Sequence, residues 1–176
     1  GDLQGEWARD VAAAIRATGG IATGTDLDGT SADSQAAIVA LAVATYGGLD
    51  FYHSNLAGGT GGDVDILDCP VDVLDTSFAI NTKSNFLASQ AALPRMIERG
   101  GGAMIYTSSG AASAGAAWQV AYPMTKNAIH ALARHVAARF GKQGVRANVI
   151  CPGLVLTEAV KQHLTDDYVE RGLNAI

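Results

Sequence analysis

The feature that most constrains the fold of this chain is the alternation of short apolar segments with longer amphipathic ones. Apolar runs of five to seven residues occur at 21–27, 49–53, 103–107 and 145–150, with helical patterns between them. Runs of this length between helices are typical of buried parallel strands, because the crossover helices cover both faces of the sheet. The sequence therefore predicts an α/β fold with a doubly wound parallel sheet.

Helical periodicity accounts for the intervals between the predicted strands. Thr30 and Asp33 have the spacing of a capping box, which predicts a helix that continues to Gly47. Pro94 is expected to disturb the following helix because proline has no N–H to donate to the preceding turn. The remaining expectations are an apolar helix face at Leu3, Trp7, Val11 and Ile15 ended by Gly19 and Gly20, a loop at 58–62, and helices at 72–99 and 120–140.

Composition excludes several classes of partner. The 176 residues are 48% apolar and 16% charged, with a formal net charge of −5. That apolar fraction can build a core, and the acidic balance argues against nucleic-acid binding. Residues 100–125 are uncharged, but their glycines and Pro123 indicate strand, loop and helix start instead of a membrane span. We expect no nucleic-acid partner and no membrane insertion.

Location and metal binding are constrained by the cysteines and histidines. Cys69 and Cys151 are too few for a disulfide framework, and no signal peptide is visible, so a cytoplasmic location is expected. His130 and His135 are five positions apart on a predicted helix, which is poor spacing for a shared ion. We predict no metal site.

The informative residues follow the predicted strands, where ligands bind in such sheets. Tyr122 and Lys126 are spaced i, i+4 at the start of a helix and therefore share one face. An ammonium beside a phenol favours the phenolate, so this pair can exchange a proton with an alcohol or ketone. Ser109 lies thirteen residues before Tyr122, where its hydroxyl could hold a substrate oxygen. An incidental Tyr–Lys pair on a surface helix is the alternative.

These residues resemble the short-chain dehydrogenase/reductase family along nearly the whole chain. Tyr122 and Lys126 match its YxxxK motif, Ser109 its active-site serine, and Asn81 the helix asparagine that completes a catalytic tetrad. The resemblance implies a Rossmann-like fold and hydride transfer between a nicotinamide cofactor and a secondary alcohol or ketone. In that mechanism Tyr122 is the proton donor or acceptor.

The resemblance also implies roles for the other members of the tetrad. Lys126 would favour the tyrosinate and bind the nicotinamide ribose, and Ser109 would orient the substrate oxygen. Asn81 would hold a water that links Lys126 to solvent. A non-catalytic relative that keeps the fold as a nucleotide-binding or scaffold protein is the alternative.

The cofactor-binding residues implied by the resemblance come from several loops. Residues 54–57 (Ser-Asn-Leu-Ala) resemble an altered NNAG segment, with Asn55 in a matching position. An acid at the end of the second strand binds ribose hydroxyls and repels a 2′-phosphate, so Asp2 favours NAD over NADP. The full expected set is Asp2, Asp28, Asn55, Tyr122, Lys126, Pro152, Gly153 and Thr157.

The sequence also departs from the family pattern. The Gly-rich TGxxxGxG turn is absent, and the glycines at 19–24 have the wrong spacing for it. Gly29 follows Asp28 where the family commonly has a β-branched residue, and Leu56 replaces an alanine. With the family's sheet order 3-2-1-4-5-6-7, residues 1–176 are expected to form a single domain that lacks the first strand–helix unit and the C-terminal strand.

Assembly is a further expectation. Apolar residues surround most of the predicted helix 120–140, which suggests that it is buried on two sides. The family resemblance implies that this helix and 72–99 pair across a two-fold axis in a homodimer or homotetramer.

Overall fold

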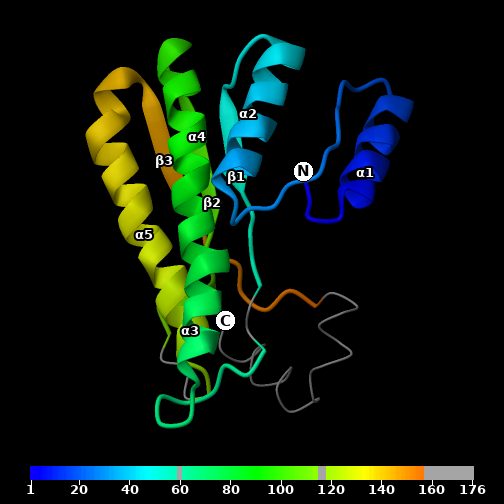
Figure 1. Ribbon diagram of the computed structural model, residues 1–176. Coiled ribbons are helices and arrows are strands. Elements are labelled where there is room, and N and C mark those ends of the chain that lie inside the picture. The colour runs from blue at the N-terminus through cyan, green and yellow to red at the C-terminus, as the bar shows by residue number, and fades with distance from the viewer. Residues whose placement is uncertain (59–60, 115–117, 157–176) are drawn as a thin grey trace.

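A computed structural model of the protein describes residues 1–58, 61–114 and 118–156 (Figure 1). From α2 onward, helical segments and strands alternate along the chain, as predicted. The strands are β1 (Phe51–Ser54), β2 (Gly102–Thr107) and β3 (Val145–Ile150). The helices are α1 (Gly5–Ala17), α2 (Ala32–Tyr46), α3 (Val71–Phe78), α4 (Ser84–Glu98) and α5 (Ala121–Phe140), with a π-helical turn at Ala79–Lys83 and 3-10 turns at Gly110–Ala112 and Gly141–Gln143.

The three strands form one parallel sheet in the order β1-β2-β3. Near their carboxyl ends, Ser54 lies opposite Tyr106 and Thr107 lies opposite Ile150. Parallel strands end at the same edge of a sheet, so the loops after them meet at that edge. The predicted α/β class with a parallel sheet and flanking helices is confirmed.

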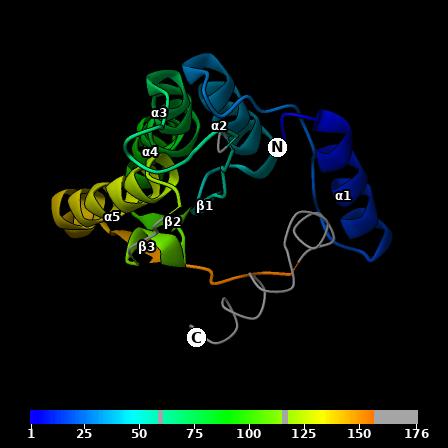
Figure 2. The same ribbon diagram turned by 90° about the horizontal axis from the view of Figure 1, so that it is seen from below.

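One face of the sheet is covered by helices. In both views α2, α4 and α5 lie together over this face, and α1 stands apart beyond the β1 end of the sheet (Figures 1 and 2). Alternate strand residues point toward the helices, as the period of a strand requires. The core built there contains Val39, Leu49, Ala92, Leu93, Met96, Met104, Tyr106, Ile129, Ala133, Val136 and Val145.

The other face of the sheet is open in the described part of the chain. Phe51 and Ile150 are about half exposed on it, and His53 is exposed beside Thr107. The predicted apolar face of α1 is also exposed, since Trp7 and Val11 keep 59% and 61% of their surface. Apolar periodicity therefore located the helix correctly, but it does not show what covers that face.

The prediction of a strand at 21–27 is wrong. This segment makes a single parallel bridge, between Asp2 and Asp26, and otherwise runs without a ladder. Asp2 donates its N–H to Thr25 O at 3.3 Å and accepts from Leu27 N at 2.8 Å. A ladder needs a partner strand of similar length, and the described chain offers this segment only a few residues.

The disturbance expected at Pro94 lies elsewhere. Pro94 is accommodated on the exposed side of α4, and the irregular turn occurs at Ala79–Lys83. There, Ser84 Oγ donates to Ile80 O, and Asn85 Nδ2 donates to Asn81 O at 2.6 Å. Side chains thus take over backbone acceptors that a regular helix would pair with N–H groups.

Among the described residues, no helix is long and apolar enough to cross a bilayer. Cys69 and Cys151 are free thiols. The same part of the chain holds no group of three or more histidine, cysteine or acidic side chains that could bind a metal ion.

Candidate active site

The first two turns of α5 hold Tyr122 and Lys126 at the carboxyl edge of the sheet. As the i, i+4 spacing requires, both side chains lie on one face, and Lys126 Nζ is 5.7 Å from the centroid of the Tyr122 ring. Tyr122 is half-buried, whereas Lys126 is 1% exposed. The pair predicted from the sequence is therefore formed.

Lys126 is held by two main-chain carbonyl groups. Its Nζ donates to Leu56 O at 3.0 Å and to Thr107 O at 3.1 Å, and these acceptors follow β1 and end β2. Burial lowers the pKa of Lys126 from 10.5 to about 8 because the ammonium is removed from water. At neutral pH the side chain remains a cation beside the Tyr122 ring.

Asn81 lies in the π-helical turn and is fully buried. Its Nδ2 donates to Gly58 O at 2.8 Å and to Ser77 O at 3.0 Å, and its Oδ1 accepts from Gly58 N at 3.3 Å. The side chain thus fixes the backbone of the segment whose Leu56 carbonyl binds Lys126. The water expected between Asn81 and Lys126 stays a prediction.

Ser109 follows β2 and caps the short 3-10 turn, where its Oγ accepts from Ala111 N at 3.2 Å. This bond leaves the hydroxyl hydrogen available to a substrate oxygen. The neighbouring Ser108 Oγ donates to Lys126 O at 2.9 Å, and Gly110 N donates to Pro152 O at 2.9 Å. These contacts join the serine loop to α5 and to the turn after β3.

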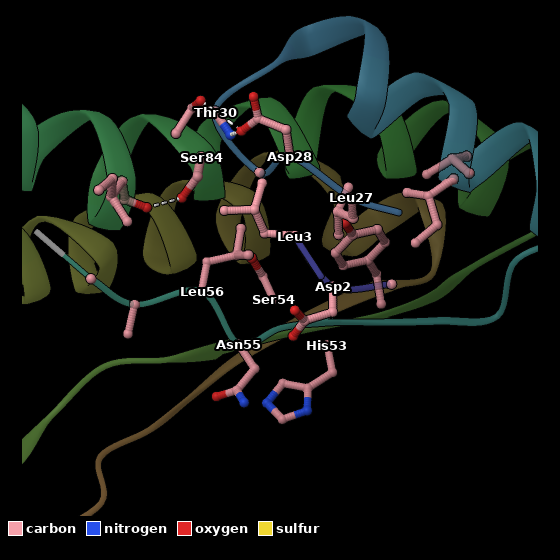
Figure 3. A pocket seen from close by; sticks show the side chains of 18 of the residues that line it. Asp2, Leu3, Leu27, Asp28, Thr30, His53, Ser54, Asn55, Leu56 and Ser84 are labelled. Atoms are coloured by element: carbon pink, nitrogen blue, oxygen red, sulfur yellow. Dashed lines mark hydrogen bonds between the residues drawn. The ribbon is translucent and has the colours of Figure 1, made fainter. Parts of the chain in front are cut away.

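The acidic and amide residues expected to bind a cofactor border one cavity of about 960 Å³ (Figure 3). Asp2, Asp28 and Asn55 all line it, and Asn55 comes directly after β1. Ser54 also lines it, and the Oγ of this residue is buried without a hydrogen-bond partner among the described residues. A buried orphan hydroxyl of this kind is a donor and acceptor for a polar ligand.

Asp28 is preorganised as an anion. Its Oδ1 accepts from Thr30 Oγ1 at 2.7 Å and from Thr30 N at 2.9 Å, and these bonds lower the pKa of the Asp28 carboxyl. The turn that results moves the cap of α2 to Ser31, one residue beyond the expected Thr30. Asp2 is exposed, and its Oδ1 accepts from Gln4 N at 2.8 Å.

Two of the departures from the family pattern, Gly29 and Leu56, lie next to each other in the lining of the cavity. A Cβ placed on Gly29 would lie 2.7 Å from Leu56 Cδ1, closer than nonbonded carbon atoms approach. Leu56 therefore occupies the space that a β-branched residue at position 29 would need.

The structure joins Lys126 and Asn81 through the segment 56–58 and places Tyr122 beside Lys126, and it gathers Asp2, Asp28 and Asn55 at the cavity. Pro152 and Gly153 lie next to the serine loop. Thr157, the remaining cofactor prediction, falls outside the described residues.

Sequence reasoning missed the carbonyl groups of Leu56 and Thr107 as acceptors for Lys126, because any residue type supplies a carbonyl. It also missed Asp63, whose carboxylate accepts from the N–H groups of Val120, Ala121 and Tyr122. No local signal connects Asp63 to partners more than fifty positions away.

Comparisons with known proteins agree with this geometry. A family model described as enoyl-(acyl carrier protein) reductase matches residues 2–175. The chain is 38% identical over 141 residues to L-rhamnose 1-dehydrogenase (NAD(P)(+)) of Sphingomonas sp., covering 78% of this chain and 55% of that protein. It is 35% identical to the inactive 2-(S)-hydroxypropyl-CoM dehydrogenase 2 of Xanthobacter autotrophicus, covering 94% of this chain and 70% of that protein.

Among solved structures, 7 alpha-hydroxysteroid dehydrogenase complexed with NADH and 7-oxo glycochenodeoxycholic acid superposes with a TM-score of 0.86. Its sequence is 30% identical, and the match covers 94% of this chain and 64% of that one. The parallel sheet and its Tyr–Lys pair thus define a Rossmann-type α/β protein. The chain belongs to the short-chain dehydrogenase/reductase family, and it spans 55% of the length of the rhamnose dehydrogenase.

Proposed function

We propose that the protein is an NAD(P)-dependent oxidoreductase that interconverts a secondary alcohol and a ketone. The observation that carries this proposal is the buried ammonium of Lys126, fixed between two carbonyl groups and 5.7 Å from the Tyr122 ring. A cation in that position stabilises a phenolate, which is the form of tyrosine that takes a proton from an alcohol.

Each residue of the proposed mechanism has a separate task. Tyr122 exchanges the proton with the substrate oxygen, and Ser109 orients that oxygen through its hydroxyl hydrogen. Lys126 stabilises the phenolate, while Asn81 holds Gly58 and so keeps the Leu56 carbonyl on Lys126. A bound nicotinamide would supply the hydride acceptor or donor.

The cavity at Asp2, Asp28 and Asn55 fits part of a dinucleotide, since it offers carboxylate, amide and orphan hydroxyl groups. In this proposal Asp2 binds the adenosine ribose, Asp28 contacts the adenine, and Asn55 contacts the part of the cofactor between these two groups. Lys126 and Tyr122 bind the nicotinamide ribose. Pro152, Gly153 and Thr157 belong to the loop that meets the nicotinamide. The exposed Asp2 carboxylate repels a 2′-phosphate, so NAD is the preferred cofactor.

The turnover rate of the Tyr122→Phe variant tests the proposed role of Tyr122 in proton exchange. We expect a loss of at least about a thousandfold in kcat, because the phenyl ring cannot exchange a proton. NADH affinity, measured by quenching of protein fluorescence, should change by less than about twofold. Absorbance of NADH with a panel of secondary alcohols and ketones gives the rates, and unchanged turnover in the variant would refute the role of Tyr122.

The competing proposal is a non-catalytic relative that binds a nucleotide. It is favoured by the 35% identity to a protein named as an inactive dehydrogenase. NADH binding without turnover of any substrate in the same panel would support this alternative.

Assembly into a homodimer or homotetramer completes the proposal. Phe86 on α4 and Met124 on α5 keep 50% and 46% of their surface exposed, so both helices present apolar side chains away from the sheet. A second copy of the chain would cover these residues across a two-fold axis.

A further inference from the structure

The start of α5 has no cap within its own sequence. Val120 occupies the N-cap position and has no side-chain hydrogen-bond acceptor. The first N–H groups of a helix lack intrahelical partners, and leaving them unpaired in a partly buried site is costly. A residue from elsewhere in the chain must therefore accept from them.

Asp63 supplies this acceptor from the segment after β1. Its Oδ1 accepts from Val120 N at 3.0 Å and from Ala121 N at 2.9 Å, and its Oδ2 accepts from Tyr122 N at 2.8 Å. The next residue is Pro123, which has no N–H, and Met124 N bonds to Val120 O. One carboxylate thus satisfies every N–H from 120 to 123.

The same segment contacts two other residues of the candidate site. Leu56 O accepts from Lys126 Nζ, and Gly58 is clamped by the Asn81 side chain. Asp63 adds the backbone of Tyr122 to this set. Leu56, Gly58 and Asp63, which all follow β1, are therefore bonded to three of the four residues assigned to the chemistry.

We propose that Asp63 is a positioning residue, which fixes the Tyr122 backbone and so sets the phenol relative to Lys126. This inference rests on the proposed function for its effect on turnover, but its structural part stands independently. Partial burial opposes ionisation of Asp63, yet the N–H groups of Tyr122, Ala121 and Val120 outweigh it and lower the pKa of the carboxyl. Cys69 is the titratable group that contacts it in the described chain, with Sγ 3.8 Å from Oδ1.

Two substitutions at Asp63 remove different numbers of its hydrogen bonds to the start of α5. Asp63→Ala removes all three bonds. Asp63→Asn keeps an oxygen for Val120 and Ala121 but turns an NH2 group toward Tyr122 N–H, so it removes that one bond selectively. Asp68→Asn is the matched control, since Asp68 is an exposed acid of the same segment whose carboxylate accepts no hydrogen bond from the described residues.

Amide hydrogen exchange gives a readout independent of activity. In Asp63→Ala we expect exchange at Val120, Ala121 and Tyr122 to accelerate by about tenfold or more, while the core of α5 keeps its protection. In Asp63→Asn the acceleration should be largest at Tyr122. Unchanged exchange at these amides, or equal acceleration throughout α5 in both variants, would overturn the proposal.

Steady-state kinetics supply the second readout. A displaced phenol should lower kcat by about tenfold in Asp63→Ala, with KM for the cofactor within about twofold, and Asp63→Asn should recover part of kcat. An equal loss in Asp68→Asn, or a loss carried by KM alone, would contradict a positioning role. If the wild-type protein shows no turnover, the proposed function fails, and the exchange experiment still decides the role of Asp63.

Discussion

At the scale of single residues, Lys126 is a buried cation whose pKa is lowered by desolvation. The residue is 1% exposed and its pKa is lowered to about 8, so burying the protonated form costs stability. Two carbonyl groups offset part of that cost, but no carboxylate pairs with it among the described residues. The resulting cation is desolvated and therefore acts strongly on the nearby Tyr122 ring.

The lowered pKa of Lys126 predicts that the free energy of unfolding depends on pH. Between pH 8 and 10.5 the unfolded state holds the Lys126 proton more tightly than the folded state, so stability relative to Lys126→Met rises with pH. The difference in free energy of unfolding should grow by about 3 kcal/mol across that window. Urea titrations of both proteins at a series of pH values measure it, and parallel curves would contradict it.

Gly29 and Leu56 form a second residue-scale pair. A β-branched side chain at position 29 would push the Leu56 side chain into the cavity, because the two would lie 2.7 Å apart. We expect Gly29→Val to destabilise the protein by about 1 kcal/mol, since the flexible leucine end yields part of the strain. In a Leu56→Ala background the same substitution should be nearly neutral, and additive effects in the double-mutant cycle would refute the pairing.

At the scale of elements, helix starts are decided by bonds that cross element boundaries. The helix α2 begins with its own cap, Ser31, whose side chain accepts from Ser34 N at 3.2 Å. The helix α5 depends instead on Asp63, and the turn at Ala79–Lys83 depends on Asn85 and Gly58. The start of α5 and the π-helical turn, which carry Tyr122 and Asn81, are thus held by bonds from other segments.

The cap of α2 gives a test at this scale. Ser31→Ala should lower the free energy of unfolding by about 1 kcal/mol, because the Ser34 N–H loses its acceptor. Ser31→Asp keeps an acceptor at the helix N-terminus and should remain within a few tenths of a kcal/mol of the wild type. Equal losses in the two variants, measured by urea unfolding, would show that the cap is elsewhere.

At the scale of the whole molecule, apolar surface is distributed unevenly. The described sheet has helices on one face (Figure 2). Phe51 and Ile150 are exposed on the other face, and the apolar side of α1 is also exposed. The cavity lies between the Asp2 segment and β1, which do not pair with each other. These surfaces differ from the outer faces of α4 and α5, which we assign to self-association.

Light scattering after size exclusion tests that assignment. The combined substitutions Phe86→Arg and Met124→Arg should convert a dimer or tetramer into smaller species, because they place charges in the proposed contact. Val11→Arg on the exposed face of α1 is the control and should leave the mass unchanged. A monomeric wild type, or a mass change in the control variant alone, would contradict the assignment.

The sequence located the regular elements well where one period dominates. The strand predicted at 145–150 matches β3, and the helix predicted at 120–140 differs from α5 by one residue. The strand at 21–27 was wrong because its ladder depends on neighbours that periodicity does not reveal. The kink assigned to Pro94 was wrong because side-chain bonds around Asn81 decide where α3 and α4 are interrupted.

By itself the sequence predicted which residues form the candidate site. The i, i+4 spacing places Tyr122 and Lys126 on one helix face, and strand ends bring Ser109 and Asn55 to one sheet edge, because backbone periodicity is local. Only the tertiary structure decided which carbonyl groups accept from Lys126, that Gly29 packs against Leu56, and that Asp63 accepts from the N–H of Tyr122. These contacts join segments distant in sequence, so they arise only when packing brings their backbones within hydrogen-bonding distance.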